Sequence, residues 1–296
     1  MPKSVFKLGL MAVVLSLSLG LTACLPPEKP SGDKKGDTEK ETPTSTDTSG
    51  GNTKVGANSN LALGNPSNAK PDTSSPTNFL SERKQFAMSY NRDKGIPNWV
   101  SWHLDKNDLG DVERSQFKAD PELPAGWYKV TPQDYTNSGY DRGHMCPSAD
   151  RDKTEKDNEA VFVMTNIIPQ AGGNNQGPWA NLEKYSRRLV EDGNELYIIC
   201  GGSGEKEKIA KGKVSVPKKT WKVIVVLKNG SDDLKRINEN TRVIAISMPN
   251  EEDVRTQDWQ EFRTTVAAIE KDTGYKLLSN LPANVQKALK SKVDKE

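Results

Sequence analysis

The sequence predicts an α+β domain, and two observations carry this prediction. Apolar runs of strand length recur from residue 99 onward, and helical stretches lie between and after them, without the regular alternation of a parallel βαβ protein. Beyond the N-terminal segment, no run reaches the roughly 20 apolar residues that a membrane-spanning helix needs. We therefore expect one folded domain and exclude a bundle of membrane helices.

The expected strands and helices follow from side-chain type and from helix end signals. Strand residues are β-branched or aromatic and form short apolar runs. The predicted strands are Trp99–Leu104, Val161–Asn166, Leu196–Cys200, Thr220–Leu227 and Thr241–Ser247. One helix should begin at Pro178, which suits a first helical position, and end at Gly193. Two more helices are predicted over Trp259–Asp272 and Pro282–Val293.

Composition and charge narrow the class of protein further. The chain has 296 residues, an apolar share of only 33% and a mean hydropathy of -0.75, so part of its length should be unfolded. Its 42 basic residues are nearly balanced by 40 acidic ones, which excludes a strongly basic packaging protein. Residues 79–296 alone hold 34 basic and 33 acidic residues. Any contact with nucleic acid must therefore be local.

The first 24 residues resemble the signal of a bacterial lipoprotein. Two lysines precede the apolar run Leu8–Gly20, which is followed by Leu21–Cys24. This pattern predicts cleavage of residues 1–23, acylation of the Cys24 thiol, and a mature protein anchored to a membrane of the bacterial cell envelope, outside the cytoplasm. An ordinary signal peptide and an uncleaved anchor are the alternatives.

A flexible stalk is predicted between this signal and the folded domain. Residues 25–78 contain no Phe, Trp or Tyr and are rich in Pro, Gly, Ser, Thr, Asp and Lys. Such a segment cannot bury enough apolar surface to offset the entropy of ordering it. We therefore predict a disordered stalk over residues 24–60, with low order extending to about residue 78, and a folded domain over residues 61–296.

The two remaining cysteines leave a choice open. Cys146 follows a turn-rich stretch and Cys200 ends a predicted strand, in a compartment where disulfides persist. A disulfide between them and two free buried thiols both fit the sequence. A nucleophilic role is disfavoured, because the neighbour His144 is the only hint of a Cys-His arrangement.

Residue types that suit catalysis are found together in the run Tyr140–Pro147, in which His144 follows Arg142 and Gly143. An arginine offers a permanently charged fork for phosphate oxygens, and glycine allows a ligand to approach the backbone. A neutral imidazole beside a guanidinium suits phosphodiester hydrolysis, because the base takes a proton from water while the cation meets the growing charge. The plainer interpretation is a histidine of the surface or the core, which is how we interpret His103.

A second polar group follows in the chain. Asn175 lies in a glycine-bounded loop before the predicted helix, and on that helix Glu183 and Arg187 are four residues apart, on one face. The plainer interpretation is a surface ion pair worth roughly a few tenths of a kcal/mol. A turn, a strand and a helix could instead bring these side chains and His144 into one pocket.

Together these motifs carry a family resemblance. The pattern Asp141–His144, with Thr165–Gln170, Asn175 and Glu183, resembles the DNA/RNA non-specific endonuclease family, in particular its cyanobacterial-type secreted branch. The similarity extends from about Leu61 to the last predicted helix. It implies a ββα-metal nuclease core in which helices flank a central, mainly antiparallel sheet.

The resemblance implies a role for each matching residue. His144 matches the general base, and Asn175 matches the single protein ligand of a divalent ion, normally Mg²⁺ with Mn²⁺ as a substitute. One amide ligand suffices, because Mg²⁺ keeps several of its waters. Glu183 matches the residue that holds a metal-bound water.

The arginines and Asn166 match supporting positions of the family. Arg114 matches an arginine that stabilises the transition state, with Arg187 as its partner, although its spacing to the histidine is one residue short of the family pattern. Arg142 and Asn166 match positions that contact phosphate or shape the site. Cys146 is a variation in the tail of the motif.

We therefore expect an extracytoplasmic, lipid-anchored and metal-dependent endonuclease that cleaves DNA and RNA to products with 5′ phosphates. Its partners would be the two nucleic acids and, through Cys24, a membrane. The resemblance leaves open whether a protein inhibitor binds it and in which oligomeric state it exists. The competing interpretation is a non-catalytic surface lipoprotein that binds nucleic acid with the same groove.

Overall fold

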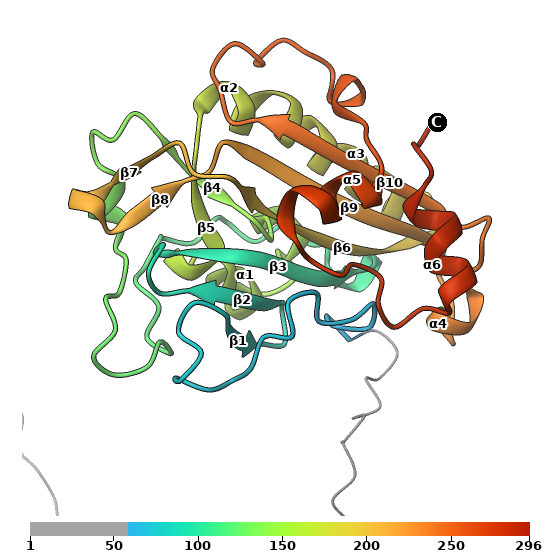
Figure 1. The fold of residues 1–296 in the computed structure, drawn as a ribbon, viewed down its shortest axis with the longest axis horizontal. Helices are drawn as coiled ribbons and strands as arrows, with labels where there is room; N and C mark the ends of the chain where they lie inside the picture. The colour runs from blue at the N-terminus through green and yellow to red at the C-terminus, as the bar shows by residue number, and fades with distance from the viewer. Residues whose placement is uncertain (1–58) are drawn as a thin grey trace, which may run out of the picture. The chain divides into compact units, whose positions relative to one another are not determined.

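The computed structural model describes residues 59–296, so the predicted signal, Cys24 and most of the predicted stalk lie outside the described residues. A six-stranded antiparallel sheet forms the centre, in the order β1-β2-β3-β6-β9-β10 (Figure 1). Its strands are β1 (Phe79–Glu82), β2 (Ala87–Asn91), β3 (Ile96–Leu104), β6 (Asn194–Ser203), β9 (Lys219–Lys228) and β10 (Arg242–Pro249).

Both faces of this sheet are buried. Successive side chains of a strand point to opposite faces, so each strand contributes alternate residues to two separate apolar cores. The first core contains Trp102 of β3 and Cys200 of β6, whereas the second contains their near neighbours Trp99 and Ile199. The sheet is therefore the middle layer of three.

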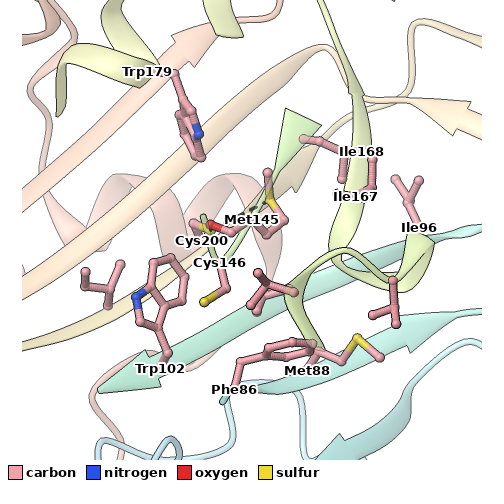
Figure 2. Close-up of a cluster of buried hydrophobic side chains, with 14 of the residues drawn as sticks. Phe86, Met88, Ile96, Trp102, Met145, Cys146, Ile167, Ile168, Trp179 and Cys200 are labelled. Carbon is pink, nitrogen blue, oxygen red and sulfur yellow. Dashed lines mark hydrogen bonds between the residues drawn. The ribbon is translucent and has the colours of Figure 1, made fainter. Parts of the chain in front are cut away.

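The layer over the first core carries the predicted site. It consists of a two-stranded antiparallel sheet, β4 (Asp141–His144) with β5 (Ile167–Gln170), and of the helices α1 (Glu155–Val161) and α3 (Ala180–Glu191). Figure 2 shows Ile167, Ile168 and Met145 of this layer against Trp102 and Cys200 of the large sheet. The apolar residues that follow β4 and open β5 therefore fix the small sheet on the large one.

The layer over the second core is formed by the two ends of the described chain. It comprises α5 (Val266–Thr273), α6 (Ala283–Lys290) and the turns that hold Leu61, Ala62 and Ala69. The remaining elements are the short helices α2 (Gly172–Asn174) and α4 (Asp233–Arg236) and the hairpin β7 (Glu207–Ile209) with β8 (Val214–Val216).

Most of the predicted elements are confirmed. The predicted strands from residues 99, 196, 220 and 241 lie in β3, β6, β9 and β10. The helix expected from Pro178 is α3, which Gly193 follows at φ +83°, a backbone angle that favours glycine. The helix expected over Pro282–Val293 is α6, for which Pro282 is the N-cap.

Two predicted elements are wrong. The run Val161–Asn166 is not a strand, because its first residue ends α1 and its last three form a 3-10 turn, so the strand begins only at Ile167. A fully apolar run gives no periodicity that separates strand from helix. The helix predicted over Trp259–Asp272 is interrupted, because Arg263 pairs with Ile246 in an isolated bridge and Thr265 then caps α5.

Residues 59–78 are ordered, although we expected low order to extend to about residue 78. Asn65 bonds to both backbone groups of Ala69 at 2.9 Å, and Asn78 donates from Nδ2 to the Ser67 carbonyl at 2.8 Å. Side-chain amides thus fold a segment that lacks aromatic residues. Within residues 59–296, no helix has the length and apolar character that crossing a membrane requires.

Candidate active site

The loop that follows β4 is held by Asn166. β4 ends at His144, which pairs with Ile167 of β5. The Asn166 amide donates to the carbonyls of Cys146 (2.9 Å) and Val161 (2.8 Å), and its Oδ1 accepts from the Cys146 N–H (3.0 Å). Asn166 is fully buried and all of these bonds are to backbone groups. Of the two roles that we expected for it, Asn166 therefore fits the one that shapes the site.

The His144 imidazole is enclosed by aromatic rings. Its ring centroid lies 5.1 Å from that of Phe117 and 4.8 Å from that of Phe162, and its Nε2 is buried without a hydrogen-bond partner among residues 59–296. Burial first, and then the positive charge of Arg114, lower the pKa of His144 from 6.5 to about 3. The imidazole is therefore neutral at physiological pH, as a proton acceptor must be.

Arg114 and Arg142 bring two unneutralised charges to this ring cluster. The Arg114 guanidinium lies 5.3 Å from the Phe162 ring centroid, and that of Arg142 lies 5.5 Å from the Phe117 centroid. Arg142 also donates from Nε (3.2 Å) and Nη2 (2.8 Å) to the Pro132 carbonyl. Neither arginine forms an ion pair within the part of the chain that the structure describes, so both charges are available to a phosphate.

Two buried or half-buried polar side chains anchor the loop that carries Arg114. The Gly110 N–H donates to Asp152 Oδ1 at 2.7 Å, and the Ser115 N–H donates to Asn158 Oδ1 at 3.0 Å. Both acceptors come from the polar stretch that follows the histidine motif. This stretch therefore positions Arg114, which lies 30 residues before His144 in the chain.

Asn175 sits at the start of a π turn, Asn175–Trp179, that joins α2 to α3. Its Nδ2 donates to Asp141 Oδ2 at 2.8 Å, and Gln176 Nε2 donates to the same oxygen at 2.8 Å. The amide nitrogen is bonded to Asp141, and within residues 59–296 the Asn175 Oδ1 accepts no hydrogen bond, so it is available as an acceptor. Asp141 and His144 occupy the two ends of β4, so one short strand positions both the candidate ligand and the candidate base.

Glu183 and Arg187 do not form the surface ion pair of the plainer interpretation. Glu183 Oε1 lies 3.7 Å from the Nζ of Lys222 in β9, and Arg187 donates from Nη1 to Asp150 Oδ1 at 3.0 Å. Burial raises the pKa of Glu183, which Lys222 partly offsets. Burial also disfavours the charged form of Arg187. The negative charge of Asp150 and its hydrogen bond favour that form, and the pKa of the guanidinium is raised.

The predicted site residues thus fall into connected groups around β4. His144, Arg114 and Arg142 share the ring cluster, Asn175 is bonded to Asp141, and Glu183 and Arg187 lie on α3. Within residues 59–296, no hydrogen bond or ion pair joins His144 directly to Asn175, Glu183 or Arg187. Sequence reasoning missed Asp150 and Lys222, although an isolated lysine in the apolar run of β9 was a detectable signal.

Cys146 and Cys200 are free, buried thiols, the second of the two alternatives that the sequence left open. Cys200 Sγ lies 3.5 Å from the Met145 carbonyl oxygen and 3.7 Å from Met145 Sδ (Figure 2). Burial raises the pKa of Cys200 to about 12 and that of Cys146 well above its ordinary value. Neither thiol is therefore an activated nucleophile.

Comparison with known proteins places this arrangement in a family. Residues 64–284 match the family described as DNA/RNA non-specific endonuclease. The chain is 50% identical over 235 residues to a nuclease of Nostoc sp., covering 79% of this chain and 85% of that protein. It is 31% identical over 247 residues to the nuclease of Serratia marcescens, with the same coverage of 79% and 85%. The chain belongs to the DNA/RNA non-specific endonuclease family.

A mitochondrial nuclease and a solved structure are also similar to this chain. Human mitochondrial nuclease EXOG is 31% identical over 206 residues, which are 64% of this chain and 54% of that protein. A crystal structure of the EndoG/EndoGI complex, titled for the mechanism of EndoG inhibition, aligns with a TM-score of 0.63 at 22% identity, over 75% of this chain and 91% of that chain. This likeness confirms the expected fold, a ββα core formed here by β4, β5 and α3.

The donors around Asn175 fit the divalent metal of such an endonuclease. The Asn175 Oδ1 is an oxygen ligand, and the Asp141 carboxylate, which accepts from Asn175 Nδ2, adds negative charge beside it. Oxygen donors without thiolate suit hard cations such as Mg²⁺ or Mn²⁺.

A second group of metal-ligand residue types does not fit a metal. His103, Glu195 and Asp233 are buried with ligand atoms within 4.8 Å of one another, and His103 Nε2 lies 3.0 Å from Glu195 Oε2. Arg236 contacts Glu195 and lies 2.7 Å from Asp233 Oδ1, so a guanidinium already occupies an oxygen of each carboxylate. Tyr197 also donates to Asp233. We assign this group to internal structure, which agrees with the plain interpretation of His103.

Proposed function

We propose that the chain is a divalent-metal-dependent endonuclease that hydrolyses phosphodiester bonds in both DNA and RNA. The observation that carries this proposal is the combination of a buried, neutral His144 with two arginines, Arg114 and Arg142, that have no acidic partner within residues 59–296. A polynucleotide backbone supplies the missing negative charge. The family membership supports the same activity.

The residues of the site support a hydrolytic step with water as the nucleophile. His144 accepts a proton from a water opposite the leaving group, and the oxygen of that water bonds to phosphorus. The bond between phosphorus and the 3′ oxygen breaks, and this oxygen takes up a proton from a second water, so the product carries a 5′ phosphate. Arg114 and Arg142 meet the charge that grows on the phosphate oxygens. Because no ribose hydroxyl takes part, DNA and RNA both serve as substrates.

Asn175 Oδ1 would hold Mg²⁺, with Mn²⁺ as a substitute, and Glu183 would accept hydrogen bonds from water beside the cation. When bound, the cation supplies positive charge that neutralises the phosphate in the transition state. Contacts made to phosphates rather than to base edges account for weak sequence preference.

We also propose that the mature enzyme is lipid-anchored through Cys24 and acts outside the cytoplasm. This proposal rests on the N-terminal sequence, a short apolar run followed by Leu21–Cys24. Radiolabelled palmitate fed to expressing bacterial cells should label the chain, and Cys24→Ser should abolish the label while nuclease activity persists in the lysate. A Cys24→Ser protein that labels as strongly as the wild type would contradict the anchor.

The catalytic proposal is tested with the full chain, purified in detergent and supplied with plasmid DNA and with RNA. Cleavage of both is expected with Mg²⁺, and EDTA should abolish it. His144→Ala should lose at least ~10²-fold in rate, the size of a general-base contribution. A matched unfolding midpoint for this variant would show that the loss is catalytic. Binding of both nucleic acids without cleavage under any divalent ion would instead favour the non-catalytic lipoprotein.

A further inference from the structure

Lys222 occupies a position where a lysine is rarely found. It lies in β9 of the six-stranded sheet, and only 1% of its surface is exposed. Its neighbours in register are Cys200 of β6 and Ile246 of β10, both buried. Lysines are almost never buried to this degree unless they are paired, because removing a charge from water is costly.

The surroundings of Lys222 leave it one acidic partner. Its Nζ lies 4.1 Å from the ring centroid of Trp179 and 5.8 Å from that of Trp102, and 3.7 Å from Glu183 Oε1. Figure 2 shows Trp179, which ends the π turn before α3, and Trp102 of β3 in the same core. Within residues 59–296, Lys222 makes no other ion pair, so its charge is directed at Glu183.

Within residues 59–296, Lys222 is the one residue that forms an ion pair with Glu183. Arg187 lies one helical turn further along α3, but its Nη1 is bonded to Asp150 Oδ1 at 3.0 Å. Burial raises the pKa of Glu183, and the opposing effect of Lys222 is the largest that lowers it. A methionine or leucine could fill the space between two tryptophans at lower desolvation cost, so packing alone does not explain a lysine here.

We propose that Lys222 is a positioning residue of the active site, which holds the Glu183 carboxylate charged and in place from within the sheet. Asn175 opens the π turn that joins α2 to α3, and Glu183 lies on α3, beyond a kink at Gly177. Lys222 thereby connects the core of the large sheet to the side of the site where the cation would bind. This inference rests on the proposed function of Glu183 but concerns a residue outside the family motif.

A double-mutant cycle tests the proposal with the full chain in detergent and Mg²⁺. Lys222→Met and Lys222→Gln remove the charge and shorten the side chain by only one atom. Each should lower kcat at least ~10-fold with KM within about twofold, because Glu183 acts on the reaction rather than on substrate binding. In a Glu183→Gln background, the same Lys222 substitutions should cause less than about a twofold further loss, because their partner charge is already gone.

Controls separate positioning from stability and from failure of the proposed function. Lys228→Met, an exposed lysine on the same strand, should leave kcat unchanged, and unfolding midpoints identify any variant that does not fold. The use of two Lys222 variants keeps the cycle complete if one is unstable. Equal losses in the wild-type and Glu183→Gln backgrounds, or wild-type kcat in both variants, would overturn the inference. A wild-type chain without Mg²⁺-dependent cleavage would instead refute the proposed function.

Discussion

At the scale of the residue, the candidate base His144 also affects stability in acid. Its pKa is lowered from 6.5 to about 3 by burial and by Arg114, so the unfolded chain binds the proton more tightly than the folded one. Stability is therefore full above about pH 6.5 and is lost as the pH falls towards 3. The same burial that keeps the base neutral makes the fold sensitive to acid.

We expect His144→Leu to flatten this pH dependence. Leucine suits the space between two phenylalanine rings and takes up no proton. Between pH 6 and pH 4, the free energy of unfolding of the wild type should fall more steeply than that of the variant, by up to about 1.4 kcal/mol per pH unit. Urea unfolding at a series of pH values measures both slopes, and parallel curves would show that the imidazole is not held neutral by the fold.

Asn166 is expected to govern stability rather than substrate contact. Asn166→Ala leaves two buried carbonyls and one buried N–H without their partner, which should cost about 3 kcal/mol of unfolding free energy. Asn240→Ala, at an exposed residue with no side-chain hydrogen bond within residues 59–296, is the matched control and should change stability by less than about 0.5 kcal/mol. Denaturant titration compares them, and a fully stable Asn166→Ala protein would contradict this role.

At the scale of the element, the small β4–β5 sheet controls the position of the candidate cation ligand Asn175. A Cβ on Gly143 would lie 2.7 Å from the Cβ of Gln170, which bonds to Asn174 directly before the candidate ligand Asn175. Gly143→Ala should therefore displace the turn at the end of β5 and lower kcat/KM at least ~10-fold. In Gly230→Ala the new Cβ makes only ordinary contacts, so activity should persist. Full activity in Gly143→Ala would show that the turn tolerates the shift.

The elements that the sequence predicted well are those in which packing residues and end signals dominate the local pattern. β9 and β10 are β-branched and apolar, and α3 has both end signals, so local pattern and final structure agree. β4 was not predicted as a strand because its residues, Asp141–His144, were selected for chemistry rather than for strand propensity. The strand predicted over Val161–Asn166 is wrong because the apolar residues of this run are buried in a helix end and a turn.

The site residues were predictable where they belong to a local motif. They were not predictable where they depend on contacts between residues far apart in the sequence. The motif located His144, Asn175 and Glu183 by spacing. Asp150 contacts Arg187 of α3, which lies 37 positions later in the chain, and Lys222 contacts Glu183 of α3, which lies 39 positions earlier. No local sequence pattern encodes contacts between residues so far apart. Folding alone brings these partners together.

At the scale of the whole molecule, charge is almost balanced and much of it is paired internally. Residues 79–296 hold 34 basic and 33 acidic residues, and most of the arginines there form ion pairs. Arg114 and Arg142 stand apart because they lie beside His144 without an acidic partner in the described chain. The substrate should therefore be held by a few local phosphate contacts rather than by a broad basic surface.

This charge distribution predicts a shallow salt dependence of DNA binding. Each neutralised phosphate contributes about −0.9 to the slope of log affinity against log salt, so two contacts give a slope of about −2. In the inactive His144→Ala background with EDTA, Arg114→Gln should reduce the slope by about 1, since one contact is lost. Arg188→Gln, an exposed arginine without an ion pair in residues 59–296, should leave it unchanged. Fluorescence anisotropy at several KCl concentrations measures the slopes, and a wild-type-like slope for Arg114→Gln would mean that this arginine does not contact the backbone.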